Sequence, residues 1–180
     1  PGESAKTVVV PLIDDRAPEG LESFDLVVTG TALDGSPVAQ RAGATIAITE
    51  AQAGSDVGRI QAMAHPLGDG RYRLSGTKIF ISYGDQDFTD QILHMVLART
   101  PNAAPGTRGL CVFLVPKLLA GTGANNGISV RRVEHKMGLR ASPTCVVEYD
   151  QSVAFPLSEE GRGLSAMFAI RGLSMVPYVL

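Results

Sequence analysis

The sequence contains no tryptophan and only two cysteines, Cys111 and Cys145, among its 180 residues. Each cysteine lies within an apolar run, which favours a buried free thiol. A disulfide between them is the alternative. Free thiols are typical of a reducing compartment, so we expect a cytoplasmic protein.

Long apolar runs and basic tracts are also missing. No stretch reaches the roughly 20 apolar residues that a membrane span requires, and no charged-then-apolar leader is present. The formal net charge of −2 gives a nucleic-acid partner no electrostatic support. The chain starts at Pro1 and ends in an apolar run, so we expect a fragment of a longer protein.

Apolar residues and turn formers are plentiful. Apolar residues make up 44% of the chain and charged residues 19%, enough for a buried core in one domain or slightly more. With 20 glycines and 11 prolines, many short turns are expected. The three histidines lack the spacing of metal ligands, so no metal site is predicted.

From residue 44 onward, apolar runs separated by turn signals predict a series of strands. They cover residues 44–48, 61–65, 72–82, 92–98, 109–115, 128–133 and 144–149. Gly76 marks a bulge or kink in the third of these strands. Strands joined by short turns, without helices between them, predict a mainly β fold, an antiparallel barrel or sandwich, over residues 44–157.

The N-terminal residues 1–43 follow no clear pattern and form an uncertain segment. Residues 7–13 and 24–31 are candidate strands, and residues 38–42 are a short candidate helix.

After Pro156 the pattern becomes helical, and we interpret residues 158–180 as the start of a truncated C-terminal helical domain. Leu164, Met167 and Phe168 are predicted to share one face of its first helix.

The most informative stretch is residues 49–56 (TEAQAGSD), which follows a predicted strand. Gly54, Ser55 and Asp56 predict a turn with backbone N–H groups and a hydroxyl facing outward, which suits an anionic or carbonyl-rich ligand. The alternative is a purely structural role, in which Asp56 caps the following turn at 57–60.

Three stretches in a fixed order carry a family resemblance: residues 49–56 (TEAQAGSD), 74–82 (LSGTKIFIS) and 134–144 (EHKMGLRASPT). Together they resemble the central β-domain of the acyl-CoA dehydrogenase family, over roughly residues 44–170. Three segments are most similar to the 3-methylmercaptopropionyl-CoA dehydrogenase branch: the loop at 84–87 (GDQD), the loop at Asn126 and Gly127, and residues 134–137 (EHKM).

The resemblance implies an FAD-dependent enzyme that catalyses α,β-dehydrogenation of an acyl-CoA thioester with hydride transfer to the flavin, as in fatty acid oxidation. It also implies an electron-transfer flavoprotein as electron acceptor and a homo-oligomeric full-length protein. The residues it assigns to FAD binding are Ile46, Ala47, Ile48, Thr49, Gly54, Ser55, Phe80, Ile81 and Ser82. Ser55 would also contact the acyl-CoA, and Phe80 would pack on the flavin ring.

The chain departs from the family pattern at several positions. Ala51 stands in place of a usual proline, Phe80 in place of a frequent tryptophan, and Ser82 in place of a common threonine. No glutamate here matches the family's catalytic base, so no catalytic residue is assigned. Glu159 and Glu160 lie in a polar loop and are predicted to be solvent exposed.

Simpler interpretations apply to four other ionisable residues. His94 lies in an apolar strand and is predicted to be a hydrogen-bonded core histidine. Lys78 is predicted to be a solvated charge at a strand edge. Arg131 and Arg132 are predicted to lie on an exposed strand face.

Three alternative functions stay open. A non-enzymatic, DNA-associated flavoprotein of the same fold would need a basic surface, which the net charge of −2 does not favour. An acyl-CoA oxidase would share the motifs and differ in its reactivity with oxygen. An unrelated antiparallel β-module that binds a partner protein would fit the periodicity but not the three ordered motifs.

Overall fold

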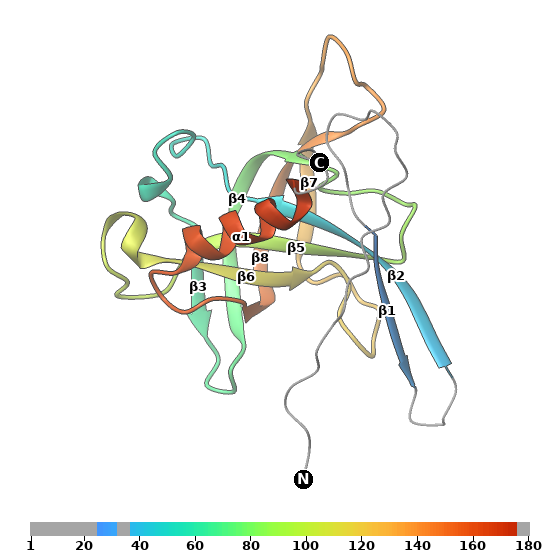
Figure 1. Ribbon diagram of the computed structural model, residues 1–180, viewed down its shortest axis with the longest axis horizontal. Helices are drawn as coiled ribbons and strands as arrows, with labels where there is room; N and C mark the ends of the chain where they lie inside the picture. The colour runs from blue at the N-terminus through green and yellow to red at the C-terminus, as the bar shows by residue number, and fades with distance from the viewer. Residues whose placement is uncertain (1–24, 32–36, 176–180) are drawn as a thin grey trace.

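The computed structural model describes residues 25–31 and 37–175 and shows strands that surround a common core, with one helix near the C-terminal end (Figure 1). The strands are β1 (Asp25–Thr31), β2 (Pro37–Ala47), β3 (Met63–Pro66), β4 (Tyr72–Ser82), β5 (Gln91–Arg99), β6 (Leu110–Pro116), β7 (Ile128–Val133) and β8 (Thr144–Pro156). The other elements are the 3-10 turns η1 (Val57–Arg59) and η2 (Gly106–Gly109) and helix α1 (Gly163–Met175). The candidate strand at 7–13 lies outside the described residues.

Five strands close into a ring in the order β5, β3, β4, β8 and β6, with β6 returning to β5. The link between β3 and β5 is one parallel pair, Met63 with Arg99. Strand β7 pairs with β8 beside this circuit. Strand β2 pairs with β5, and the β1–β2 hairpin projects from the ring (Figure 1). The prediction of a mainly β fold is therefore confirmed.

The antiparallel prediction holds for most strand pairs but not for those that join β2 and β3 to β5, which are parallel. Parallel neighbours need a long crossover connection. For β2 and β5 that connection is residues 48–90, which include η1, β3 and β4.

The predicted helix at 38–42 is wrong, because these residues belong to β2. They pair with β1 in antiparallel register, and Ala42 also starts the parallel pairing with β5. The backbone of this short segment is thus satisfied by neighbouring strands, which overrides its local helical preference.

The bulge or kink predicted at Gly76 is confirmed as a register shift, in which the extra residue lies on the partner strand β8. The register between β4 and β8 shifts between Leu74 and Gly76, and Gly76 has a φ of 154°. A Cβ atom at Gly76 would lie 2.7 Å from the Cβ atom of Ala62. The close approach of the strand to Ala62 therefore requires glycine here.

The core lies inside the ring, and β5 is buried along nearly its whole length, as its apolar run predicts. The largest buried side chains of the core include Leu74, Ile81, Leu97, Leu110, Phe113 and Tyr149. Cys111 and Cys145 are both buried and free, as predicted. Strand β7 buries only Ile128 and is otherwise mostly exposed.

Helix α1 packs on β6, so the helix predicted after Pro156 is confirmed. Met167 is buried and Leu164 is half-buried, whereas Phe168 is 65% exposed. The prediction that all three share one face of the helix is therefore wrong for Phe168. Neighbouring positions on a helix point about 100° apart, so Phe168 turns out of the contact that Met167 makes. Among the described elements, no helix has the length and apolarity that crossing a membrane requires.

Candidate functional site

The end of β2 and the end of β4, far apart in the sequence, lie side by side. The Ile79 amide donates a hydrogen bond to the Thr49 carbonyl at 2.8 Å. The Thr45 hydroxyl donates to the Ser82 carbonyl at 2.7 Å. The structure therefore brings together the two segments to which the sequence assigns flavin binding.

Phe80 lies on a bulge of β4 itself, where the register with β8 shifts between Lys78 and Ile81. Its φ of 59° is in the left-handed region, which is uncommon for an aromatic residue. Lys78 and Ile81 point inward, whereas the Phe80 ring is 61% exposed. A bulge of this kind re-aims a side chain, and here it presents a flat apolar surface.

Thr49 offers hydrogen-bond donors next to the segment of β4 that carries Phe80. It is half-buried, and its carbonyl is occupied by Ile79. Within the described ranges, neither the Thr49 amide nor its hydroxyl has a hydrogen-bond partner, and the same holds for the Ser82 hydroxyl. An apolar wall with a few free donors matches the needs of a flat cofactor with a polar edge, so these residues fit a flavin.

The turn after Thr49 is closed by two backbone hydrogen bonds between Glu50 and Ala53, at 3.0 and 3.3 Å. Ala51, at its tip, is exposed. Gly54 and Ser55 follow in an exposed bend, and a Cβ atom on Gly54 would meet nothing within 4 Å. Both residues are open to a ligand, as the predicted binding turn requires.

The remaining predicted flavin-site residues differ in what they can offer. Ala47 and Ile81 are buried in the core, so only their backbone groups can face a ligand. Ile46 and Ile48 are half-buried.

Lys78, predicted as a solvated edge charge, is instead fully buried, and that prediction is wrong. Its ammonium forms an ion pair with Glu50 Oε1 at 2.9 Å. It also donates to the carbonyls of Ile48 at 2.9 Å and Leu97 at 2.6 Å. The period of two along β4 places Lys78 on the same face as buried Leu74, and this signal could have identified it.

Glu50 is the functional-site residue that the sequence reasoning missed. Its carboxylate accepts hydrogen bonds from the amides of Gln61 at 2.8 Å and Ala62 at 2.9 Å, and from the Gln52 side chain. Together with Lys78 it ties the end of β2, the 50–53 turn and the start of β3 to β4.

The two charges act on each other. Burial raises the pKa of the Glu50 carboxyl, but the charge and hydrogen bond of Lys78 and the two backbone donors outweigh it, and the pKa is lowered. Burial lowers the pKa of Lys78 to about 8, against the opposing attraction of Glu50. The site is therefore an ion pair at neutral pH.

His94 is a hydrogen-bonded core histidine, as predicted: its Nδ1 lies 2.9 Å from the Tyr149 hydroxyl. Burial lowers the pKa of His94 to about 3, so the ring is neutral. In the described part of the chain, no group of three or more histidine, cysteine or carboxylate side chains could hold a metal ion.

Asp56 is at the N-cap position of η1, as predicted. Its side chain forms no capping hydrogen bond, so the prediction that this side chain caps the turn is wrong. Its backbone carbonyl accepts from the Arg59 amide instead.

Other charged residues lie where the sequence places them. Glu159 and Glu160 are exposed, as predicted, and so are Arg131 and Arg132.

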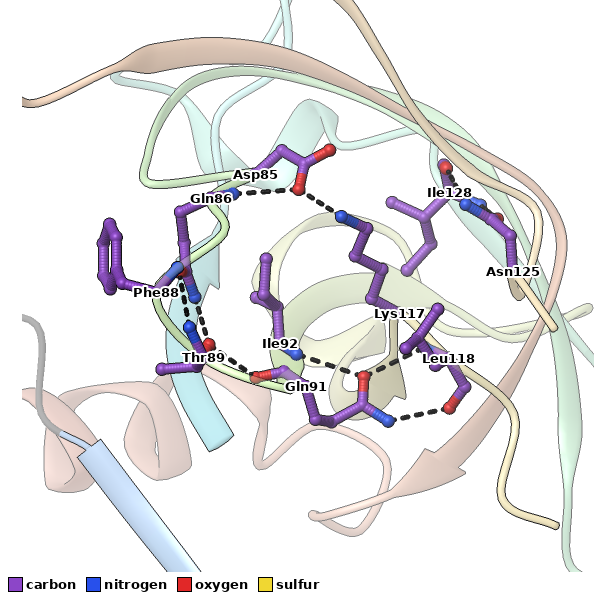
Figure 2. A network of polar contacts seen from close by, with 10 residues as sticks. All are labelled: Asp85, Gln86, Phe88, Thr89, Gln91, Ile92, Lys117, Leu118, Asn125 and Ile128. Atoms are coloured by element: carbon purple, nitrogen blue, oxygen red, sulfur yellow. Dashed lines mark hydrogen bonds and ion pairs between the residues drawn. The ribbon is translucent and has the colours of Figure 1, made fainter. Parts of the chain in front are cut away.

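The loop that follows β4 is held by a polar network (Figure 2). Asp85 pairs with Lys117, and the Gln91 side chain bridges to the backbone of Leu118. Gln86 accepts from the amides of Phe88 and Thr89. The network fixes the loop next to Ser82 against the end of β6.

A sequence model of the family described as "Acyl-CoA dehydrogenase, middle domain" matches residues 45–152. The 3-methylmercaptopropionyl-CoA dehydrogenase of Ruegeria pomeroyi is 51% identical over 128 residues, which cover 69% of this chain and 22% of that protein. The broad-specificity linear acyl-CoA dehydrogenase FadE5 of Mycobacterium tuberculosis is 40% identical over 138 residues, 71% of this chain and 23% of that protein.

Solved structures agree with the sequence matches. The structure of Caenorhabditis elegans ACDH-11 in complex with C11-CoA superimposes with a TM-score of 0.61 at 32% identity, covering 70% of this chain and 21% of that one. The chain thus spans between a fifth and a quarter of the length of these relatives, with shares of 22% and 23% for the two sequence matches.

Proposed function

Since the chain belongs to the acyl-CoA dehydrogenase family, we propose that it supplies one wall of the flavin and thioester site in a longer, FAD-dependent acyl-CoA dehydrogenase. The observation that carries the proposal is the pairing of Thr49 with Ile79, which brings the free donors of Thr49 to the segment that carries the exposed Phe80.

Bound FAD would supply the acceptor for the β-hydride when an acyl-CoA is oxidised to its α,β-unsaturated product. The general base that removes the α-proton lies outside this chain in our proposal, because Glu159 and Glu160 are exposed and Glu50 is paired with Lys78.

The residues of this chain would bind and orient. Phe80 would cover one side of the flavin ring and exclude water from it. The Thr49 amide and hydroxyl and the Ser82 hydroxyl would donate to the polar edge of the ring, where negative charge gathers on reduction. Ser55, in the exposed bend, would contact both FAD and the acyl-CoA.

Further features of the whole protein are part of the same proposal. We propose an acyl-CoA thioester as substrate, an electron-transfer flavoprotein as electron acceptor and a homo-oligomeric assembly. The free, buried thiols of Cys111 and Cys145 support a reducing compartment such as the cytoplasm. The name of the Ruegeria pomeroyi relative makes 3-methylmercaptopropionyl-CoA a first substrate to test.

The experiment uses the full-length protein that carries this chain. It should purify with bound FAD, and its flavin absorbance should bleach when acyl-CoA is added without oxygen. Phe80→Ala should weaken FAD binding, whereas Phe88→Ala, which removes another exposed ring, should not. A colourless protein that ignores added FAD refutes the proposal, and rapid reoxidation by oxygen would identify an oxidase instead.

A further inference from the structure

Lys78 reaches across the ring of strands to three acceptors. It starts from β4 and ends on the Leu97 carbonyl of β5, the Ile48 carbonyl and the Glu50 carboxylate, at 2.6, 2.9 and 2.9 Å. An ammonium group has three protons, so each has an acceptor. Two of the three acceptors belong to the segment that contains Thr49.

The contact with Ile48 bears directly on the Thr49 amide, because the Ile48 carbonyl and the Thr49 N–H belong to one peptide unit. The described chain has no cis peptide bond, and in a trans peptide the two groups point in opposite directions. With the carbonyl aimed at Lys78 inside the ring, the N–H points away from it. This N–H is the donor without a partner among the described residues.

We propose that Lys78 is a positioning residue that polarises the peptide unit between Ile48 and Thr49 and so strengthens the Thr49 amide as a donor to the flavin. The inference rests on the proposed function, since it requires FAD beside Thr49. A charged donor on the carbonyl draws electron density from the amide, and linked hydrogen bonds strengthen each other at low dielectric. The effect favours the reduced flavin, which carries the additional negative charge.

Stability alone does not account for a buried ion pair at this position. Apolar residues of similar volume commonly replace such pairs without loss of stability, because desolvation offsets the attraction of the charges. The Lys78–Glu50 pair instead fixes the direction of a peptide that carries a free donor. The Ile79 amide holds the next carbonyl, that of Thr49, so the donor is oriented from both sides.

The test is the flavin reduction potential of the full-length holoenzyme at pH 6, which is below the Lys78 pKa of about 8 in the wild type. Lys78→Met should make the potential more negative by about 30 mV, a tenfold change for a two-electron couple. Glu50→Gln leaves the ammonium on Ile48 without its counter-ion and should make the potential more positive. Lys117→Met removes a charge from the separate pair with Asp85 (Figure 2) and should leave the potential unchanged.

The opposite signs separate this role from a structural one, since mere loosening of the site would move both variants the same way. Equal signs, or no shift in flavin-containing variants, overturn the inference while the proposed function stands. If Lys78→Met fails to bind FAD, the shift of the flavin reduction potential in Glu50→Gln is the deciding measurement. A shift of zero or a shift to a more negative potential then overturns the inference. A wild-type protein without FAD refutes the proposed function itself.

Discussion

The buried pair of Lys78 and Glu50 makes a quantitative prediction for stability. In Lys78→Met, the Glu50 carboxylate keeps its two backbone donors but loses its counter-ion. Leaving the buried carboxylate charged and unpaired cannot cost more free energy than protonating it, because the group would then take up a proton instead. From the ordinary value of 4.5, neutralisation at pH 7 costs about 3 kcal/mol, at about 1.4 kcal/mol per pH unit. We therefore expect Lys78→Met to lower the free energy of unfolding by up to about 3 kcal/mol.

Glu50→Leu should cost a similar amount, because the Lys78 ammonium then lacks its counter-ion. The double variant Lys78→Met/Glu50→Leu removes both charges, so it should lose much less than the sum of the two single losses. The coupling free energy should be on the order of 3 kcal/mol.

Urea unfolding of the four proteins, followed by circular dichroism at pH 7, measures the cycle. Lys117→Met, which breaks a partly exposed ion pair, is the matched control and should lose no more than about 1 kcal/mol. If the two single losses add to within about 0.5 kcal/mol, the charges do not interact and the reasoning is refuted.

Three further predictions concern the stability of the fold. Gly76→Ala should destabilise the protein by about 1–3 kcal/mol, because the new Cβ would lie 2.7 Å from Ala62; Gly54→Ala, in open space, is the control for this urea measurement. Glu50 has a lowered pKa in the folded state, so the stability it contributes is present above pH 4.5 and is lost as the pH falls below that value. Acid unfolding should show this loss in the wild type and not in Glu50→Gln. Tyr149→Phe leaves buried His94 without its partner and should cost about 1–3 kcal/mol by urea unfolding, and an unchanged midpoint would contradict that expectation.

Local sequence patterns predicted the strands well but could not predict which strands are neighbours. Each predicted strand from residue 44 onward corresponds to a strand of the structure, and the register shifts at Gly76. Periodicity indicates which face of a single strand is buried, but it does not indicate which strand pairs with it or whether the two run parallel. The parallel pairing of β2 with β5 therefore had no local signal, and the same pairing turned residues 38–42 from a candidate helix into strand.

The sequence motifs predicted the exposed segments of the candidate site but not the buried residues behind them. The motifs place Thr49 and Phe80 in one site, and the structure brings their segments into contact. Lys78 was misassigned because charged residues are seldom buried unless they are paired. Its partner, Glu50, lies on a segment that only the tertiary fold brings near.

The interior contacts explain how Phe80 can be held in an unfavourable conformation. A left-handed backbone conformation at a residue other than glycine costs on the order of 1–3 kcal/mol and persists only where the surrounding structure fixes it. Lys78 on one side is anchored to Leu97 across the ring, and Ile81 on the other side is buried in the core. Between these two inward anchors the bulge at Phe80 has one direction left, toward solvent. The buried contacts of Lys78 and Ile81 thus determine that the Phe80 ring is exposed at the surface.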